Sequence, residues 1–134
     1  MKVVGLLSRK GGVGKTTLAV HLAVLAQAAG RQTLLIDLDP QRSAAGWWRV
    51  REAATPLLLE TGPDQLSDML ETAGNDGVDL AVIDTRPSAE VDAVQVAKLS
   101  DLVLVPTRPG ILDLRAILDT LDTAKARRGV RWSH

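Results

Sequence analysis

The sequence predicts an α/β fold in which a parallel β-sheet carries helices on both faces, in three layers. Short apolar runs alternate with longer segments of helical periodicity, giving five β-α repeats along the chain. The runs are almost uniformly apolar, which is typical of strands buried on both faces of a parallel sheet. A glycine-rich stretch at residues 10–17 follows the first strand and leads into the first helix. Right-handed crossovers between parallel strands then place helices on both faces.

The elements follow from the apolar runs and from the residues that end them. We expect strands at residues 3–7, 33–36, 56–60, 79–83 and 102–105. We expect helices at residues 16–29, 43–54, 64–72, 91–99 and 112–128. Gly30 should end the first helix and Gly129 the last, while Ser43 and Asp64 are candidate N-caps. The segment from Gly74 to Gly77 should break the chain.

Length and composition limit the class of protein. The 134 residues predict a single domain spanning residues 1–134. The formal net charge is zero, so the whole molecule has no general attraction for nucleic acid. The chain has no cysteine, which excludes disulfides, thiolate zinc sites and iron–sulfur ligation. It has no apolar run of membrane-spanning length and no cationic leader, so we expect a cytoplasmic protein with no membrane partner.

The stretch KGGVGKTT, residues 10–17, predicts a phosphate-binding loop between a strand and a helix. Its glycines allow backbone N–H groups to approach an anion, and the helix adds its positive N-terminal end. The Lys15 amine would reach the β- and γ-phosphates of a nucleotide, and the Thr16 hydroxyl would bind Mg²⁺. The nucleotide-binding residues expected here are Lys10, Gly11, Gly12, Val13, Gly14, Lys15, Thr16 and Thr17.

Carboxylates follow two of the later strands. Asp37 and Asp39 lie in LLIDLDPQ, at the carboxyl end of a strand, where open α/β sheets place their ligand sites. A simple turn would also use Asp and Pro at this place. Asp84 ends the strand in VDLAVID, downstream of the phosphate loop, which is the Walker B arrangement for a carboxylate that holds a Mg²⁺ water.

These motifs resemble those of the ParA/MinD family of P-loop ATPases. KGGVGKT has a second lysine, Lys10, and Arg9 where the strict motif has glycine, and in this form it resembles the deviant Walker A motif. LLIDLDPQ resembles the ParA-type switch I segment. The resemblance implies a P-loop NTPase fold, ATP and Mg²⁺ as cofactors, and Lys10, Lys15 and Asp39 as catalytic residues. Lys10 would touch the partner's phosphates in a nucleotide-sandwich dimer, and Asp39 would position the attacking water. Thr16, Asp37 and Asp84 would serve the metal.

The resemblance is strongest to short ParA/ParF-type partition proteins and extends over essentially the whole chain. It implies an ATP-dependent homodimer, a ParB-like or other adaptor partner, nonspecific DNA binding, and nucleoid association if that binding is retained. The function implied is plasmid or chromosome partition, or positioning of a related cargo. Family members continue with C-terminal strands and helices that this sequence lacks, so a C-terminally truncated domain is expected.

Four further features depart from this pattern or extend it. The family usually has Pro-Pro after Asp-x in switch II, and this chain has Arg86 before Pro87. The loop 106–113 resembles the proline-rich loop of ParF-type proteins, although a plain connection would also explain it. Trp47 and Trp48 point in different directions on a helix, which predicts one buried ring and one ring available to a partner. The mildly basic residues 103–134 fit either a solvated helix end or a DNA-facing patch.

Two other functions remain compatible with the sequence. A MinD-like positioning ATPase would share the loop, but DPQ after the aspartates and the missing membrane-binding helix count against it. A non-hydrolysing protein that binds nucleotide and acts by interaction would fit the short chain and Arg86.

Overall fold

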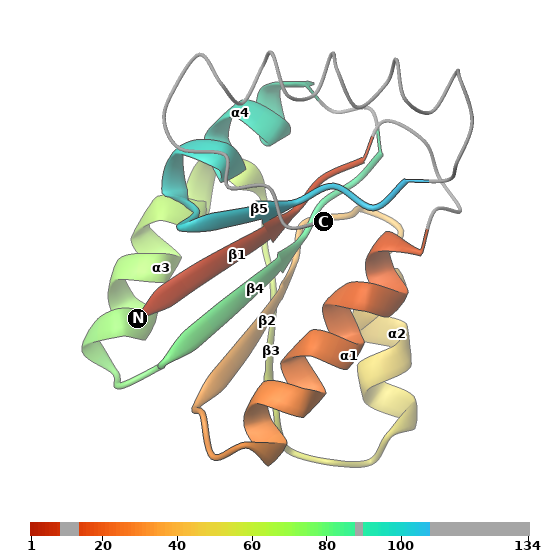
Figure 1. Cartoon of the computed structure of the whole chain (residues 1–134), viewed down its shortest axis with the longest axis vertical. Helices are drawn as coiled ribbons and strands as arrows, with labels where there is room; N and C mark the ends of the chain where they lie inside the picture. The colour runs from red at the N-terminus through yellow and green to blue at the C-terminus, as the bar shows by residue number, and fades with distance from the viewer. Residues whose placement is uncertain (9–13, 88–89, 108–134) are drawn as a thin grey trace.

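The chain forms a five-stranded parallel β-sheet in the order β3-β2-β4-β1-β5 (Figure 1). The computed structural model describes residues 1–8, 14–87 and 90–107. The strands are β1 (Lys2–Leu6), β2 (Thr33–Asp37), β3 (Leu57–Glu60), β4 (Leu80–Asp84) and β5 (Leu102–Leu104). The helices are α1 (Lys15–Ala28), α2 (Ser43–Val50), the 3-10 turn η1 (Pro63–Gln65), α3 (Leu66–Asn75) and α4 (Glu90–Leu99).

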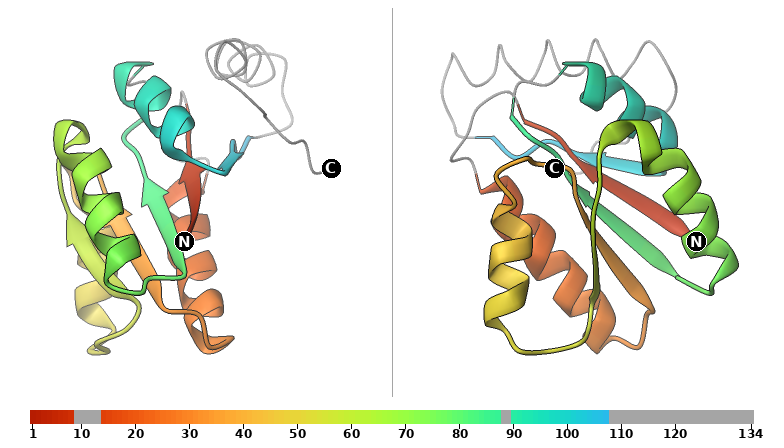
Figure 2. Two further views of the ribbon diagram at one scale, coloured as in Figure 1. Left: turned by 90° about the vertical axis from the view of Figure 1, so that its left-hand side faces the viewer. Right: turned by 180° about the vertical axis from the view of Figure 1, so that it is seen from behind.

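Helices cover both faces of the sheet, so the predicted three-layer fold is confirmed. α1 and α2 pack on one face, and α3 and α4 pack on the other (Figures 1 and 2). Each connection between parallel strands returns through a helix, as the crossover rule requires.

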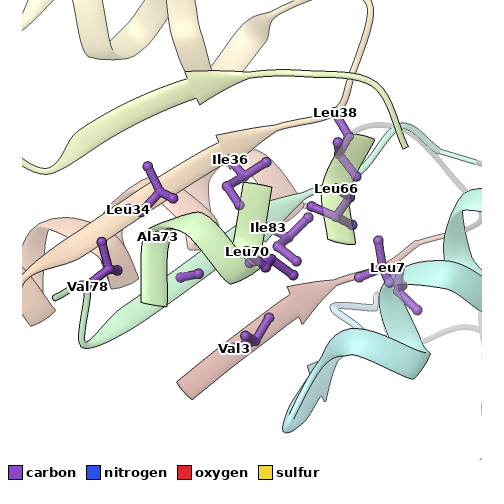
Figure 3. Packing of buried hydrophobic residues seen from close by; sticks show 12 residues of the cluster. Val3, Leu7, Leu34, Ile36, Leu38, Leu66, Leu70, Ala73, Val78 and Ile83 are labelled. Carbon is purple, nitrogen blue, oxygen red and sulfur yellow. The ribbon is translucent and has the colours of Figure 1, made fainter. Parts of the chain in front are cut away.

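The central strands divide their side chains between two apolar clusters, because successive residues of a strand point to opposite faces. In β2, Leu34 and Ile36 face α3 and α4, whereas Leu35 faces α1 and α2. Figure 3 shows the cluster on the α3 side. Its buried members are Val3, Leu7, Leu34, Ile36, Leu38, Leu66, Leu70, Ala73, Val78, Ala81, Ile83 and Val96. Burial on both faces explains why these strands read as continuous apolar runs.

The last predicted strand is shorter and less buried than expected. We expected a buried strand over residues 102–105, but β5 ends at Leu104 and all three of its residues are half-buried. β5 lies at one edge of the sheet, beyond β1, so it has one strand neighbour among the described residues. An apolar run alone does not distinguish an edge strand from a central one.

Glycines end two helices through the same hydrogen-bond pattern. Gly30 has φ 84° and Gly77 has φ 90°, in the left-handed region that glycine tolerates. At the end of α1, Arg31 N–H donates to the Ala26 carbonyl and Gly30 N–H to the Gln27 carbonyl. The prediction that Gly30 ends the first helix is confirmed. At α3 the predicted break at residues 74–77 comes late, because the helix continues through Asn75.

Neither predicted N-cap is observed. Ser43 is the first residue of α2, and the N-cap is Arg42, which makes no side-chain capping bond. Asp64 lies inside η1, and the N-cap of α3 is Gln65. In each case the helix begins at a different residue from the one that the capping pattern selected.

Part of the prediction lies outside the described residues. The final helix expected at 112–128, its end at Gly129 and the basic residues beyond 107 fall there. The assignment of residues 1–134 to one domain stays a prediction. In the described part of the chain, no helix is long and apolar enough to cross a membrane.

Candidate functional site

The predicted metal-binding aspartates meet at the carboxyl ends of neighbouring strands. Asp37 ends β2 and Asp84 ends β4, and the two are paired in the register of the sheet. Asp84 is also paired with Leu6, the last residue of β1, which leads into the predicted phosphate loop. The sheet order β2-β4-β1 therefore brings both carboxylates to the place where that loop begins.

Lys15 and Thr16 connect the start of α1 to Asp84. The Lys15 amine lies 2.6 Å from Asp84 Oδ1 and also donates to the carbonyl of Thr85. The Thr16 hydroxyl donates to Asp84 Oδ2 at 2.8 Å. Lys15 is 5% exposed and Asp84 is fully buried, so this ion pair is shielded from water. Both carboxylate oxygens of Asp84 are thus bound by residues of the predicted loop motif.

Asp37 is held mainly by the backbone. Its Oδ1 accepts from the N–H of Asp39 and its Oδ2 from the N–H of Ala45, each at 3.0 Å. Burial raises the pKa of the Asp37 carboxyl above its ordinary value, and the nearby charge of Asp84 adds to the rise. The two backbone N–H groups and Arg42 oppose it. Asp37 is therefore a buried carboxylate whose charged form is disfavoured by its surroundings.

Asp39 lies in the loop between β2 and α2. Its Oδ1 accepts from the N–H of Gln41 at 2.9 Å, and its carbonyl accepts from the N–H of Arg42 at 2.9 Å. The side chain is largely buried but remains next to Asp37, to which its backbone is bonded. This geometry fixes the loop that carries the carboxylate predicted to position water.

Of the remaining predicted nucleotide-binding residues, the structure describes Gly14 and Thr17. Gly14 is the N-cap of α1 with φ 82°, a conformation suited to glycine. Thr17 is exposed, and its carbonyl lies 2.7 Å from Nδ1 of His21. Four predicted loop residues lie outside the described part of the chain: Lys10, Gly11, Gly12 and Val13.

The donor set fits Mg²⁺ bound with a nucleotide. The hydroxyl of Thr16 and the carboxylates of Asp37 and Asp84 offer hard oxygen donors, the type that Mg²⁺ prefers. Among the described residues, no three His, Cys, Asp or Glu side chains form a cage that could hold a metal alone. Mg²⁺ in phosphate-transferring sites uses one or two carboxylates together with phosphates and waters, so this smaller set suits it.

Thr85 is a residue of the site that the motifs did not identify individually. Its hydroxyl donates to the Leu6 carbonyl at 2.7 Å, and its own carbonyl accepts from Lys15. It therefore connects the end of β4 both to the end of β1 and to Lys15 at the start of α1. Only the pairing of β1 with β4 reveals this role, and a short sequence motif contains no signal for it.

Arg86 forms an ion pair where the family pattern has proline. Its Nε lies 2.8 Å from Asp92 Oδ2 in the first turn of α4. Asp92 is 2% exposed, whereas the Arg86 side chain is 47% exposed. An ion pair therefore connects the segment after β4 to α4. Of the predicted proline-rich loop at 106–113, the structure describes only Pro106 and Thr107.

The two neighbouring tryptophans differ from the prediction of one buried and one free ring. Both are half-buried. Trp47 packs against the cluster under α1 and α2, with Arg51 Cζ 5.2 Å from its ring centre. Trp48 Nε1 donates to the carbonyl of Pro56, near β3. The rings do point in different directions, but each has a contact within the chain.

Comparison with known proteins identifies the family of this chain. The model of the CobQ/CobB/MinD/ParA nucleotide binding domain matches residues 4–132. The maintenance of carboxysome distribution protein A of Gloeobacter kilaueensis is 42% identical over 127 residues, which cover 92% of this chain and 56% of that protein. The chromosome-partitioning ATPase Soj of Thermus thermophilus is 29% identical over 154 residues, covering 93% of this chain and 62% of that protein. The chain thus spans little more than half the length of these curated relatives.

A solved structure shares the fold. The structure of pNOB8 ParA bound to nonspecific DNA superposes with a TM-score of 0.70 at 22% identity, covering 90% of this chain and 58% of that one. The fold, the family model and the curated relatives agree with the resemblance predicted from the motifs. The chain belongs to the CobQ/CobB/MinD/ParA family of nucleotide-binding domains.

Proposed function

We propose that the chain is a ParA-like ATPase that binds and hydrolyses Mg-ATP in a nucleotide-sandwich homodimer. The observation that carries this proposal is the contact of Lys15 and Thr16 with Asp84, beside the buried Asp37. The family to which the chain belongs includes the ParA and MinD P-loop ATPases. The one-domain organisation of residues 1–134 is part of the same proposal.

In this proposal each described side chain has a distinct task. The Lys15 amine exchanges Asp84 and the Thr85 carbonyl for phosphate oxygens of ATP, because a phosphate offers it more negative charge. Thr16, Asp37 and Asp84 hold Mg²⁺, which neutralises charge on the phosphates when bound. Asp39 accepts a hydrogen bond from the attacking water and orients it, in the way that positioning residues act in phosphoryl transfer. Lys10 of a second copy reaches the same phosphates.

The biological role proposed is partition of DNA or positioning of another cargo. Relatives of the chain are named for chromosome partitioning and for carboxysome distribution, and one structural neighbour was solved on nonspecific DNA. We infer an ATP-dependent dimer that binds nonspecific DNA and responds to a ParB-like or other adaptor protein. The proposed location is the cytoplasm, on the nucleoid when DNA is bound.

The test is ATP turnover by the full chain, measured as phosphate release with and without nonspecific duplex DNA. We expect turnover that DNA stimulates. Asp39→Ala should still bind Mg-ATP, because Asp39 is not among the proposed phosphate or metal ligands, but its turnover should fall by about 100-fold or more. Asp64→Ala, at an exposed aspartate of η1, is the control and should leave turnover unchanged.

Two results would contradict parts of the proposal. Normal turnover by Asp39→Ala would remove Asp39 from its role. ATP binding by the unaltered chain without turnover would favour the non-hydrolysing interaction protein instead.

A further inference from the structure

Arg42 has an unfavourable backbone conformation at the end of the loop that carries Asp39. Its φ is 56°, in the left-handed region, and it is the N-cap of α2 without a side-chain capping bond. A side chain with a Cβ is disfavoured there, because the Cβ crowds the following carbonyl. Such conformations persist where surrounding contacts determine them, and they occur often at functional sites. The contacts of the Arg42 side chain therefore need an explanation beyond helix capping.

The Arg42 side chain spans the ends of two adjacent strands. Its Nη1 donates to the carbonyl of Asp37, the last residue of β2. Its Nε lies 3.7 Å from Oε2 of Glu60, the last residue of β3. Asp37 and Glu60 are paired in the sheet, so the planar guanidinium contacts neighbouring positions on two strands.

The same residue closes the Asp39 loop. The backbone N–H of Arg42 donates to the Asp39 carbonyl, while its side chain returns to Asp37, where the loop begins. Only residues 38–41 lie between these two points. A shift of Arg42 would move this short loop and with it the Asp39 carboxylate.

We infer that Arg42 is a positioning residue for Asp39, acting through the loop without touching nucleotide. The inference rests on the proposed ATPase function and deepens it, because it explains how the water-orienting carboxylate is held relative to the end of β2. The guanidinium suits this task better than an ammonium, because it offers several donors in a fixed plane to a carbonyl and a carboxylate at once.

Arg49 provides a matched control. It lies on α2, and its Nη2 pairs with Oε1 of the same Glu60. Within the described ranges, no hydrogen bond joins the Arg49 side chain to the loop 38–41. Replacing Arg42 or Arg49 removes one positive charge and one contact with Glu60. Only the first change also removes the side-chain contact with the Asp37 carbonyl, at the start of the Asp39 loop.

The experiment measures initial rates of DNA-stimulated ATP turnover by the full chain as a function of ATP concentration. In Arg42→Ala, kcat should fall by between about 10-fold and 100-fold, the range expected for a misplaced catalytic group. Its KM for ATP should stay within about twofold, because the interaction lost is not with the substrate. Arg49→Ala should keep both parameters.

A second variant removes the side chain without the backbone strain. Glycine adopts φ 56° readily, so Arg42→Gly should fold at least as stably as Arg42→Ala. We expect the same loss of kcat in both. Retention of kcat by Arg42→Gly would overturn the inference, since the backbone turn alone would then place Asp39.

Other outcomes separate this inference from the proposal beneath it. An equal fall of kcat in Arg49→Ala would assign the effect to Glu60 and overturn the role of Arg42. A raised KM in Arg42→Ala with unchanged kcat would make Arg42 a nucleotide contact, which also overturns it. Absence of turnover by the unaltered chain would contradict the proposed function itself and this inference with it.

Discussion

Asp37 and Asp84 have the same position on neighbouring strands but different partners. Asp84 has a direct cation, the Lys15 amine at 2.6 Å, and the hydroxyl of Thr16. Asp37 has two backbone N–H groups at its oxygens, while Arg42 contacts its carbonyl. A buried carboxylate without a paired cation is penalised in its charged form. The site thus holds one carboxylate that is paired with a cation and one whose charge is opposed by burial.

The raised pKa of Asp37 predicts how stability depends on pH without metal. Because the folded pKa lies above the unfolded one, the folded state binds more protons between the two values. The contribution of this group to the free energy of unfolding is therefore present at acid pH and is lost as pH rises through the raised pKa. Between about pH 4, near the ordinary aspartate pKa, and neutral pH, the unaltered chain should lose stability relative to Asp37→Asn.

Urea unfolding in a chelator measures this difference. The asparagine lacks one of the two acceptors that bind Asp39 and Ala45, but that loss does not change with pH. The relevant quantity is the change in the difference between the two proteins across the pH range. A difference that stays constant would contradict the raised pKa.

At the residue scale, the site residues that belong to sequence motifs were predicted. The site residues whose roles depend on which strands pair in the sheet were missed. Lys15, Thr16 and Asp84 were predicted from local patterns, and the structure brings them into contact. The role of Thr85 depends on β1 lying beside β4, and that of Arg42 on β3 lying beside β2. No local pattern contains this information.

At the scale of elements, α4 approaches β1 unusually closely at Gly5. A Cβ added there would lie 2.5 Å from Cγ1 of Val96 and 2.6 Å from Oγ of Ser100. Val96 is fully buried, so it has little room to move. The apolar run of β1 therefore needs a residue without a side chain at this point.

Two glycine-to-alanine changes should have opposite effects. Gly5→Ala should lower the free energy of unfolding by about 1–3 kcal/mol, because it overpacks the contact between β1 and α4. Gly46→Ala should raise it by about 0.5–1 kcal/mol, because Gly46 lies within α2 and alanine favours the helix. In the described part of the chain, no atom apart from its neighbours and the nearby helix backbone lies within 4 Å of a Cβ added at Gly46. Chemical denaturation of both variants checks this. Equal effects of the same sign would contradict the packing described for α4.

Element boundaries were predicted well where backbone geometry decides them and less well elsewhere. Gly30 ends α1 as expected, since few other residues adopt φ 84°. Ser43 and Asp64 were wrong as N-caps, because many Ser and Asp residues near helix starts could make the same bond. The half-burial of β5 follows from its place at the edge, which an apolar run does not reveal.

At the scale of the whole molecule, the sheet order creates the site. Lys15 and Asp84 are 69 residues apart in sequence, yet the order β2-β4-β1 places their segments side by side. The parallel sheet and its two helical layers were predictable from the repeated strand and helix patterns. The strand order was not, since it depends on how the two apolar faces of each central strand are covered.

The most direct test of the central claim is thermal unfolding of the full chain with Mg²⁺ and ATP. At about 100 times its Kd, a ligand stabilises the folded state by roughly 2.7 kcal/mol. For a chain of this size we expect the unfolding midpoint to rise by about 4 °C or more. Lys15→Ala should abolish the rise, whereas Lys98→Ala, at an exposed lysine in the last turn of α4, should retain it. No rise with ATP, or an equal rise in Lys15→Ala, would contradict the assignment of Lys15 and its neighbours as the nucleotide site.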